Sequence, residues 1–166
     1  FVLSVGRQWG KSMLGMNMML YWAFNESPCK LLWVSPVYSQ TTKVQKELES
    51  AMRDSNLIDS INYSDNYMKL KNGSEIYFRS AERYDNIRGY TFDYAVLDEA
   101  AFMKAEAWRE AIRPTLAVNG KKVLFLSTPK GKNWFYELFN LSRINDNYGS
   151  FTAPSITSPY ITADEI

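Results

Sequence analysis

The sequence of 166 residues contains no histidine and only one cysteine, Cys29. Without histidine there can be no Ser-His-Asp triad and no histidine ligand for zinc, and a single cysteine can form neither an internal disulfide nor a cysteine zinc site. The groups that remain for chemistry are carboxylates, Lys, Arg and hydroxyls, with a metal such as Mg²⁺ that prefers oxygen ligands. Any catalytic site must therefore be built from these groups.

Long hydrophobic runs and a charge excess are also missing. The longest uncharged apolar run, Met18 to Phe24, is far too short to span a bilayer, and no basic leader with an apolar core precedes it. We therefore expect no membrane partner and no export. Nineteen basic residues balance eighteen acidic ones, for a net charge of +1, so any contact with nucleic acid requires a local basic patch.

A loop of the phosphate-binding kind follows the first, largely apolar run of residues 1–5 and precedes a segment with helical character. The N–H groups of such a loop and of the helix start form a concave site for anionic oxygens. Lys11 would contact the β- and γ-phosphates, and Ser12 would ligate Mg²⁺. The candidate binding residues are Gly6, Arg7, Gln8, Trp9, Gly10, Lys11 and Ser12.

This loop departs from the standard pattern at one position. Val5 stands where the first glycine belongs, and Gly6 follows one place later. The alternative is a plain glycine turn before a buried helix, with Lys11 on the surface. The strand before the loop and the helix after it favour the phosphate-binding interpretation.

The rest of the chain alternates between short apolar runs and amphipathic segments. Buried strands are predicted at 30–35, 94–99 and 122–127, and helices at 12–24, 38–53, 104–117 (interrupted near Pro114) and 133–141. The helix at 12–24 is apolar on nearly all sides, which predicts burial of most of its surface. The pattern predicts an α/β fold with a mostly parallel central sheet, covered by helices on both faces.

Between the first and second of these strands lies a region of strand-like alternation. Short strands are predicted at 61–64, 67–71 and 75–79, and Asn72-Gly73 is a strong hairpin signal between the last two. We therefore expect a β-hairpin insertion in the sheet. A polar, irregular loop is predicted at 80–93, and the Ser-, Thr- and Pro-rich tail at 148–166 could begin a helix at Ser158.

Candidate catalytic residues stand at the ends of the predicted strands, where parallel sheets bind ligands. Asp98 would complete the Mg²⁺ site with Ser12, and Glu99 would orient or deprotonate the attacking water. Thr128 could contact the γ-phosphate or the water, although a Thr-Pro turn at the surface is the alternative. An arginine could neutralise the negative charge on the transferred phosphoryl group. The candidates are Arg7 within the loop, or Arg79, Arg83 or Arg88 acting in trans.

Together, these motifs resemble the N-terminal ATPase domain of large terminase subunits, the DNA-packaging motors of tailed phages. The loop Gly-Arg-Gln-Trp-Gly-Lys-Ser is similar to the family's deviant Walker A motif, in which an Arg-Gln pair occurs and the first glycine is lost. Val-Leu-Asp98-Glu99 resembles its Walker B segment, Ser127-Thr128-Pro129 its coupling motif, and Arg88-Gly89 its Arg-Gly element. The resemblance covers about Val2 to Pro129.

The resemblance implies a P-loop NTPase of the additional-strand catalytic-glutamate type that uses ATP and Mg²⁺. It implies that Lys11 and Ser12 bind phosphate and metal, that Arg7 senses the γ-phosphate, and that Glu99 is the catalytic carboxylate. Thr128 would couple hydrolysis to movement, and Arg88 would act as an arginine finger in trans. Its implied partners are double-stranded DNA, a homo-oligomeric ring expected to be a pentamer, the portal protein and the small terminase subunit, in the cytoplasm of the host cell.

We expect residues 1–166 to form a single domain, without the adenine-contacting segment and the RNase H-like nuclease domain of a full-length large terminase. Three alternatives remain open at the level of the sequence. One is the first motor domain of a superfamily 2 helicase, although its Gly-x-Gly-Lys loop and Ser-Ala-Thr motif are not matched. The others are a nucleotide-binding module without turnover and a DNA-binding domain that uses Lys69, Lys71 and Arg79.

Overall fold

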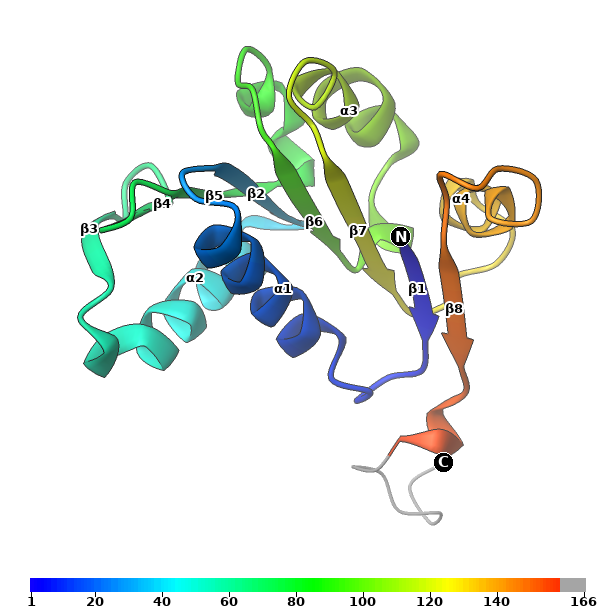
Figure 1. The fold of residues 1–166 in the computed structure, drawn as a ribbon. Coiled ribbons are helices and arrows are strands. Elements are labelled where there is room, and N and C mark those ends of the chain that lie inside the picture. Colours follow the sequence, from blue (N-terminus) through cyan, green and yellow to red (C-terminus); the bar gives the residue numbers. More distant parts are fainter. Residues whose placement is uncertain (159–166) are drawn as a thin grey trace.

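The computed structural model describes residues 1–158, which fold around one central sheet of eight strands (Figure 1). The strand order across the sheet is β3-β4-β5-β2-β6-β7-β1-β8. The strands are β1 (Val2–Val5), β2 (Lys30–Ser35), β3 (Ile58–Asn62), β4 (Tyr67–Leu70), β5 (Glu75–Ser80), β6 (Tyr94–Asp98), β7 (Lys122–Ser127) and β8 (Ser150–Ala153).

The sheet is mostly parallel, as predicted. All neighbouring strands from β5 to β8 pair in parallel, whereas β3 and β4 add an antiparallel edge. Strand β7 lies between β1 and β6, so an additional strand separates the phosphate-loop strand from the Asp-Glu strand. The three predicted buried strands at 30–35, 94–99 and 122–127 are confirmed as β2, β6 and β7, although β6 ends at Asp98, one residue before the predicted end.

The predicted hairpin is present and is integrated into the sheet. β4 and β5 pair antiparallel on either side of Asn72-Gly73, where Gly73 adopts a φ of 87°. β5 also pairs in parallel with β2, so the hairpin extends the central sheet. The strand predicted at 61–64 is wrong in its bounds, because β3 starts at Ile58 and the chain turns after Asn62, whose side chain accepts a hydrogen bond from the Asp65 N–H.

Helices cover both faces of the sheet, as expected. The α-helices are α1 (Lys11–Asn25), α2 (Tyr38–Met52), α3 (Arg113–Thr115) and α4 (Trp134–Leu141). Short 3-10 helices span Arg53–Ser55, Ala81–Ile87, Ala100–Phe102 and Ser155–Thr157, and a π-helix spans Ala107–Ile112. Pro114 lies in the first turn of α3, where its missing N–H costs little, so the helical segment changes type at the predicted interruption.

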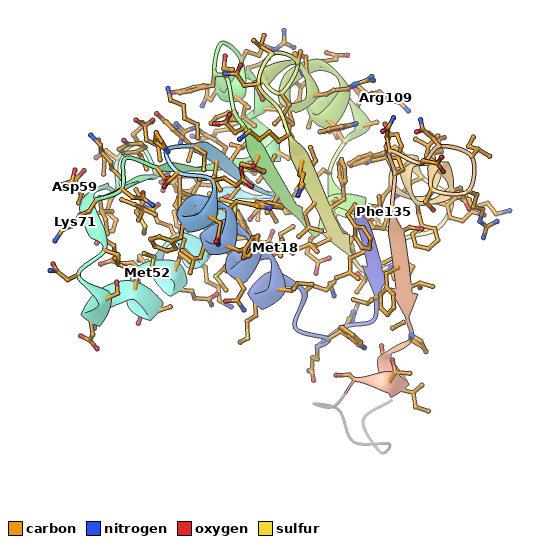
Figure 2. The ribbon with its side chains drawn as sticks, in the orientation of Figure 1. Met18, Met52, Asp59, Lys71, Arg109 and Phe135 are labelled. Carbon is orange, nitrogen blue, oxygen red and sulfur yellow. The ribbon has the colours of Figure 1, made fainter. Side chains whose placement is uncertain are left out.

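Alternation along β2 explains the two hydrophobic cores. Leu31 and Trp33 face the core on the α1 and α2 side, while Leu32 and Val34 face the core on the side of the π-helix and α4. Figure 2 shows Met52 and Phe135, which belong to the first and second core respectively. A central strand buried on both faces must be apolar throughout, which is the pattern from which the parallel sheet was predicted.

The expected burial of the first helix was wrong. Helix α1 packs on the sheet through Gly15, Met19, Trp22 and Ala23, but its outer face leaves Met13, Leu14, Tyr21 and Phe24 exposed by 63%, 41%, 58% and 38%. An all-round apolar composition indicates contact on several sides, whereas the described part of the chain covers α1 on one side only. Composition alone therefore overestimated the burial of this helix.

Two further segments differ from the expectation. Residues predicted as an irregular loop at 80–93 contain the 3-10 helix Ala81–Ile87, which is anchored because Ile87 is fully buried. The tail, for which no strand was predicted, forms β8 beside β1, with Val2 opposite Ser150. The helix that could begin at Ser158 lies almost entirely outside the described residues.

Candidate functional site

The predicted phosphate-binding loop connects β1 to α1. Its backbone turns sharply, because Gln8 and Gly10 both adopt left-handed conformations with φ values of 54° and 79°. Gly10 reaches this conformation without steric cost and forms the N-cap of α1, which begins at Lys11. In turns of this kind, successive backbone N–H groups point into one concavity, which can bind an anion.

Two carboxylates, one on the last residue of β6 and one on the residue after it, contact the first residues of α1. The Ser12 hydroxyl donates a hydrogen bond of 2.7 Å to Oδ2 of Asp98, and the Lys11 ammonium lies 4.0 Å from Oε1 of Glu99. Lys11 also donates to the Gly6 carbonyl over 2.9 Å. These residues are far apart in sequence, but they meet because parallel β1 and β6 end at the same edge of the sheet.

Burial controls the electrostatics of this cluster. Lys11 and Asp98 are each only 6% exposed. Burial raises the pKa of Asp98 to about 6, although the hydrogen bond from Ser12 favours its charged form. Burial likewise lowers the pKa of Lys11, against the opposing attraction of Glu99 and Asp98. Charges held in such a poorly solvated place interact more strongly with a ligand than charges on the surface do.

The oxygen atoms of Ser12 and Asp98 fit a magnesium ion that is bound together with a nucleotide. Within residues 1–158, no group of three or more His, Cys, Asp or Glu side chains is arranged to hold a metal ion without further ligands. Mg²⁺ is commonly held by one or two protein oxygens plus phosphate oxygens and water. A hydroxyl and a carboxylate 2.7 Å apart match that requirement.

Glu99 stands in an unusual backbone conformation. It follows β6 with a φ of 52°, which costs a non-glycine residue on the order of 1 kcal/mol and is most often retained at functional sites. Its N–H donates to Oδ1 of Asp98 over 3.1 Å. The Ser127 hydroxyl, at the end of β7, donates to Oε2 of Glu99 over 3.4 Å.

Ser127 was missed as a site residue by the reasoning from sequence, which selected the neighbouring Thr128. Ser127 is fully buried and also accepts a hydrogen bond of 3.2 Å from the Ala101 N–H, whereas Thr128 lies half-buried beyond the strand end. The available signal was a hydroxyl at the end of a continuous apolar strand, because such a buried hydroxyl needs a polar partner.

The candidate arginines lie in different environments. Arg7 is exposed on the loop. Arg88 is 52% exposed and forms ion pairs with Asp85 and Glu110, over 3.2 Å and 3.6 Å. Arg83 is exposed on the 3-10 helix before Arg88. Both Arg83 and Arg88 are therefore accessible to a neighbouring molecule.

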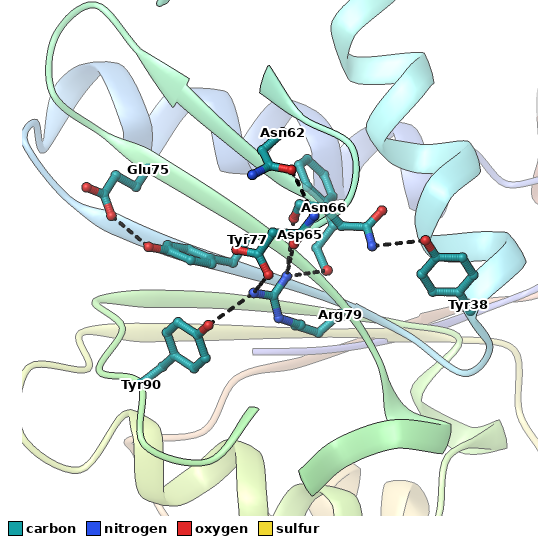
Figure 3. Close-up of polar contacts among 9 residues, drawn as sticks. Tyr38, Asn62, Asp65, Asn66, Glu75, Tyr77, Arg79 and Tyr90 are labelled. Atoms are coloured by element: carbon teal, nitrogen blue, oxygen red, sulfur yellow. Dashed lines mark hydrogen bonds and ion pairs between the residues drawn. The ribbon is translucent and has the colours of Figure 1, made fainter. Parts of the chain in front are cut away.

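Arg79 does not fit a role in trans or in DNA binding. Its side chain is 10% exposed and forms an ion pair of 3.1 Å with Asp65 (Figure 3). Its guanidinium lies 5.3 Å and 5.4 Å from the ring centroids of Tyr77 and Tyr90, and it also donates to the Asp65 carbonyl. The guanidinium is thus engaged in fastening the turn before β4 and the segment around Tyr90 to β5.

No helix among the described residues is long and apolar enough to cross a membrane.

Comparisons with known proteins point to one family. The family model described as terminase large subunit, T4likevirus-type, N-terminal, matches residues 2–162. The terminase large subunit of Escherichia phage T5 is 33% identical over 138 residues, which are 81% of this chain and 31% of that protein. That of Thermus phage G20c is 54% identical over 66 residues, 40% of this chain and 14% of that protein. The chain thus spans less than a third of the length of these curated relatives.

The fold has a solved counterpart in the same group of proteins. The large terminase ATPase domain of Thermus phage P74-26 superposes with a TM-score of 0.77 at 28% identity, over 92% of this chain and 74% of that one. The similarity in fold therefore extends over nearly the whole chain.

Proposed function

The chain belongs to the family of terminase large subunit N-terminal domains, and on this premise we propose that residues 1–166 act as one ATPase domain that drives double-stranded DNA into a viral procapsid. The observation that carries the proposal is the hydrogen bond of 2.7 Å between Ser12 and Asp98. It joins the end of the phosphate-binding loop to the Asp-Glu strand, which is where ATP hydrolysis requires metal and phosphate to meet.

In this proposal Ser12 and Asp98 hold Mg²⁺, and Lys11 neutralises the β- and γ-phosphate oxygens. When bound, Mg²⁺ supplies further positive charge to the same oxygens. In the structure the Lys11 ammonium donates to the Gly6 carbonyl and lies near Glu99. The loop from Gly6 to Gly10 contributes its backbone N–H groups to the phosphates.

Glu99 is the proposed catalytic carboxylate. It accepts the proton of the attacking water while the water oxygen bonds to the γ-phosphorus and the bond to the β,γ-bridging oxygen breaks. Its carboxylate is oriented by Ser127 and attracted by Lys11. Arg7 would contact the γ-phosphate from within the site, Thr128 would couple hydrolysis to movement, and Arg88 would reach the site of a neighbouring subunit.

The whole assembly is part of the proposal. We infer a homo-oligomeric ring, a pentamer by analogy with the family, that works with the portal protein and the small terminase subunit in the host cytoplasm. Exposed Arg88 supports action between subunits, because an arginine that acts in trans must be accessible to the neighbouring site.

The proposal is tested by ATP hydrolysis with Mg²⁺ and duplex DNA, measured beside Glu99→Gln. The variant should keep nucleotide affinity and lose at least about 10²-fold in turnover, because general-base catalysis typically contributes 10²–10⁴-fold. Glu47→Gln, on the exposed side of α2, is the matched control and should hydrolyse ATP like the unchanged chain.

Persistent turnover in Glu99→Gln would exclude Glu99 as the general base. Nucleotide binding without turnover by the unchanged chain at any concentration would instead favour a binding module. Separation of DNA strands would favour the helicase alternative over translocation of intact duplex.

A further inference from the structure

The segment that begins with the last residue of β8 lies against the phosphate-binding loop. We call residues 153–158 the strap. The Gly6 N–H donates to the Ala153 carbonyl over 3.1 Å. A Cβ atom on Gly6 would lie 2.6 Å from both the Cα and the N of Ser155, and 2.1 Å from its Oγ. Because two of these atoms are backbone atoms, no side-chain rotation could relieve the collision, and only glycine fits at position 6.

The strap also contacts the two residues at the centre of the loop. The Trp9 indole N–H donates to the Thr157 hydroxyl over 3.3 Å, and the Ser158 hydroxyl donates to the Gln8 carbonyl over 3.1 Å. Gln8 is the residue held at a φ of 54°. The strap therefore supports the loop where its backbone is least relaxed.

The strap is ordered by its own hydrogen bonds. The Thr157 N–H and hydroxyl both donate to the Pro154 carbonyl, over 3.0 Å and 2.7 Å, and the Ser158 N–H donates to the Ser155 carbonyl over 2.8 Å. This closed 3-10 turn presents Thr157 and Ser158 to the loop from a defined backbone. Its position is set by β8, which pairs with β1 up to Ala153.

One residue, Gly6, connects the strap to the charged cluster through its two flanking peptide groups. Gly6 donates its N–H to Ala153 in the strap, and its carbonyl accepts the hydrogen bond from the Lys11 ammonium. A displacement of the strap would therefore move the group that now holds Lys11. The loop is contacted by the strap at Gly6, Gln8 and Trp9, and by the carboxylates of β6 at Lys11 and Ser12.

We propose that Ser155, Thr157 and Ser158 are positioning residues for the phosphate-binding loop, and that Gly6 is glycine to admit the strap. This inference rests on the proposed nucleotide site and adds a second structural element to it. It also gives a reason for the glycine at position 6 of the deviant loop, because any side chain there would collide with Ser155. Nucleotide and strap are then linked: tightening of the strap raises nucleotide affinity, and nucleotide tightens the strap by the same factor.

The first measurement is hydrogen exchange of the nucleotide-free 166-residue chain. Thr157→Val removes the acceptor for Trp9 and the hydroxyl that closes the 3-10 turn, and it should accelerate exchange in the peptide that contains Gly6 through Gly10. Ile156→Ala is the matched control, because this neighbouring side chain is 68% exposed and should leave the loop unchanged. Equal exchange in the two variants would overturn the proposal, and this arm requires no nucleotide binding.

The second measurement is ADP affinity by calorimetry. Thr157→Val should weaken ADP about two- to tenfold, the amount expected for one net hydrogen bond, and Gly6→Ala should weaken it more because it displaces the strap backbone. ADP should slow exchange of residues 153–158 in the unchanged chain, and less so in Thr157→Val. A strap insensitive to ADP, with affinities equal to that of Ile156→Ala, would refute the linkage.

Absence of ADP binding by the unchanged chain would count against the proposed function. The exchange of the nucleotide-free loop would still decide whether the strap positions it. The two failures are therefore distinguishable.

Discussion

At the scale of single residues, the site keeps groups that the fold would be more stable without. Asp98 is buried to 6% exposure, and its pKa rises from 3.8 to about 6 because its charged form is poorly solvated. Glu99 beside it adopts a left-handed backbone conformation. Such costs are typical of residues retained for binding or catalysis.

The raised pKa of Asp98 predicts a pH-dependent gain in stability for Asp98→Asn. The pKa of Asp98 is higher in the folded state than in the unfolded state. Its favourable contribution to the free energy of unfolding is therefore present below pH 4 and is lost as pH rises through 6. Because asparagine does not ionise, the free energy of unfolding of the variant should exceed that of the nucleotide-free parent by about 1–3 kcal/mol at pH 8. The difference should be much smaller near pH 4.5.

Thermal unfolding in the absence of Mg²⁺ measures this difference. Asp146→Asn, at an exposed position, should change stability little at either pH. An Asp98→Asn variant destabilised equally at both pH values would mean that the ionised carboxylate stabilises the fold.

At the scale of elements, the contact of α1 with the sheet depends on a glycine inside the helix. A Cβ atom on Gly15 would lie 2.7 Å from Cδ1 of Leu126 on β7 and 3.0 Å from the Trp33 ring on β2. The helix therefore approaches the sheet more closely than a larger residue would permit, and this closeness places Lys11 and Ser12 at the ends of β1 and β6.

Gly15→Ala should destabilise the chain although alanine is the better helix former. Overpacking typically costs about 1–3 kcal/mol, whereas the gain in helix propensity is about 1 kcal/mol, so we expect a net loss of about 1–2 kcal/mol in urea unfolding. Asn17→Ala is the matched variant on the exposed side of the same helix and should be neutral or slightly stabilising. A stabilised Gly15→Ala variant would show that the helix can shift away from β7 at no cost.

At the scale of the whole molecule, Arg88 lies on the same surface segment as Arg83 and far in sequence from the loop. Its ion pairs with Asp85 and Glu110 are at the surface, with the Arg88 side chain 52% exposed, and exposed pairs are worth at most about 1 kcal/mol. These ion pairs can therefore be replaced at little cost by a contact between Arg88 and the phosphates of a nucleotide bound to a neighbouring subunit.

If the site is completed between subunits, specific ATPase activity should rise with protein concentration. Arg88→Ala should leave the ADP affinity of the dilute chain unchanged and abolish this rise. Arginine fingers contribute about 10³–10⁵-fold in other NTPases, so a loss of at least about tenfold at high concentration is expected. Arg83→Ala is the comparison on the same segment. If Arg83→Ala removes the rise and Arg88→Ala does not, the finger is Arg83.

Much of this protein follows from its sequence, because the deciding patterns are local. Continuous apolar runs placed β2, β6 and β7, Asn72-Gly73 placed the hairpin, and the residues from Gly6 to Ser12 placed the loop between a strand and a helix. These patterns depend on neighbours a few residues away, and steric and solvation rules act directly at that range. The same patterns led to the family resemblance.

Only the tertiary structure decided which residues complete the site. Ser127 rather than Thr128 contacts Glu99, Arg79 is engaged inside the fold, and the unpredicted strand β8 brings the strap onto the loop. Each of these contacts joins segments that the strand order brings together, and strand order depends on the packing of whole helices and sheets. A hydroxyl or a glycine acquires its partner only when that packing is complete, so no local pattern could have identified Ser155 as the reason for Gly6.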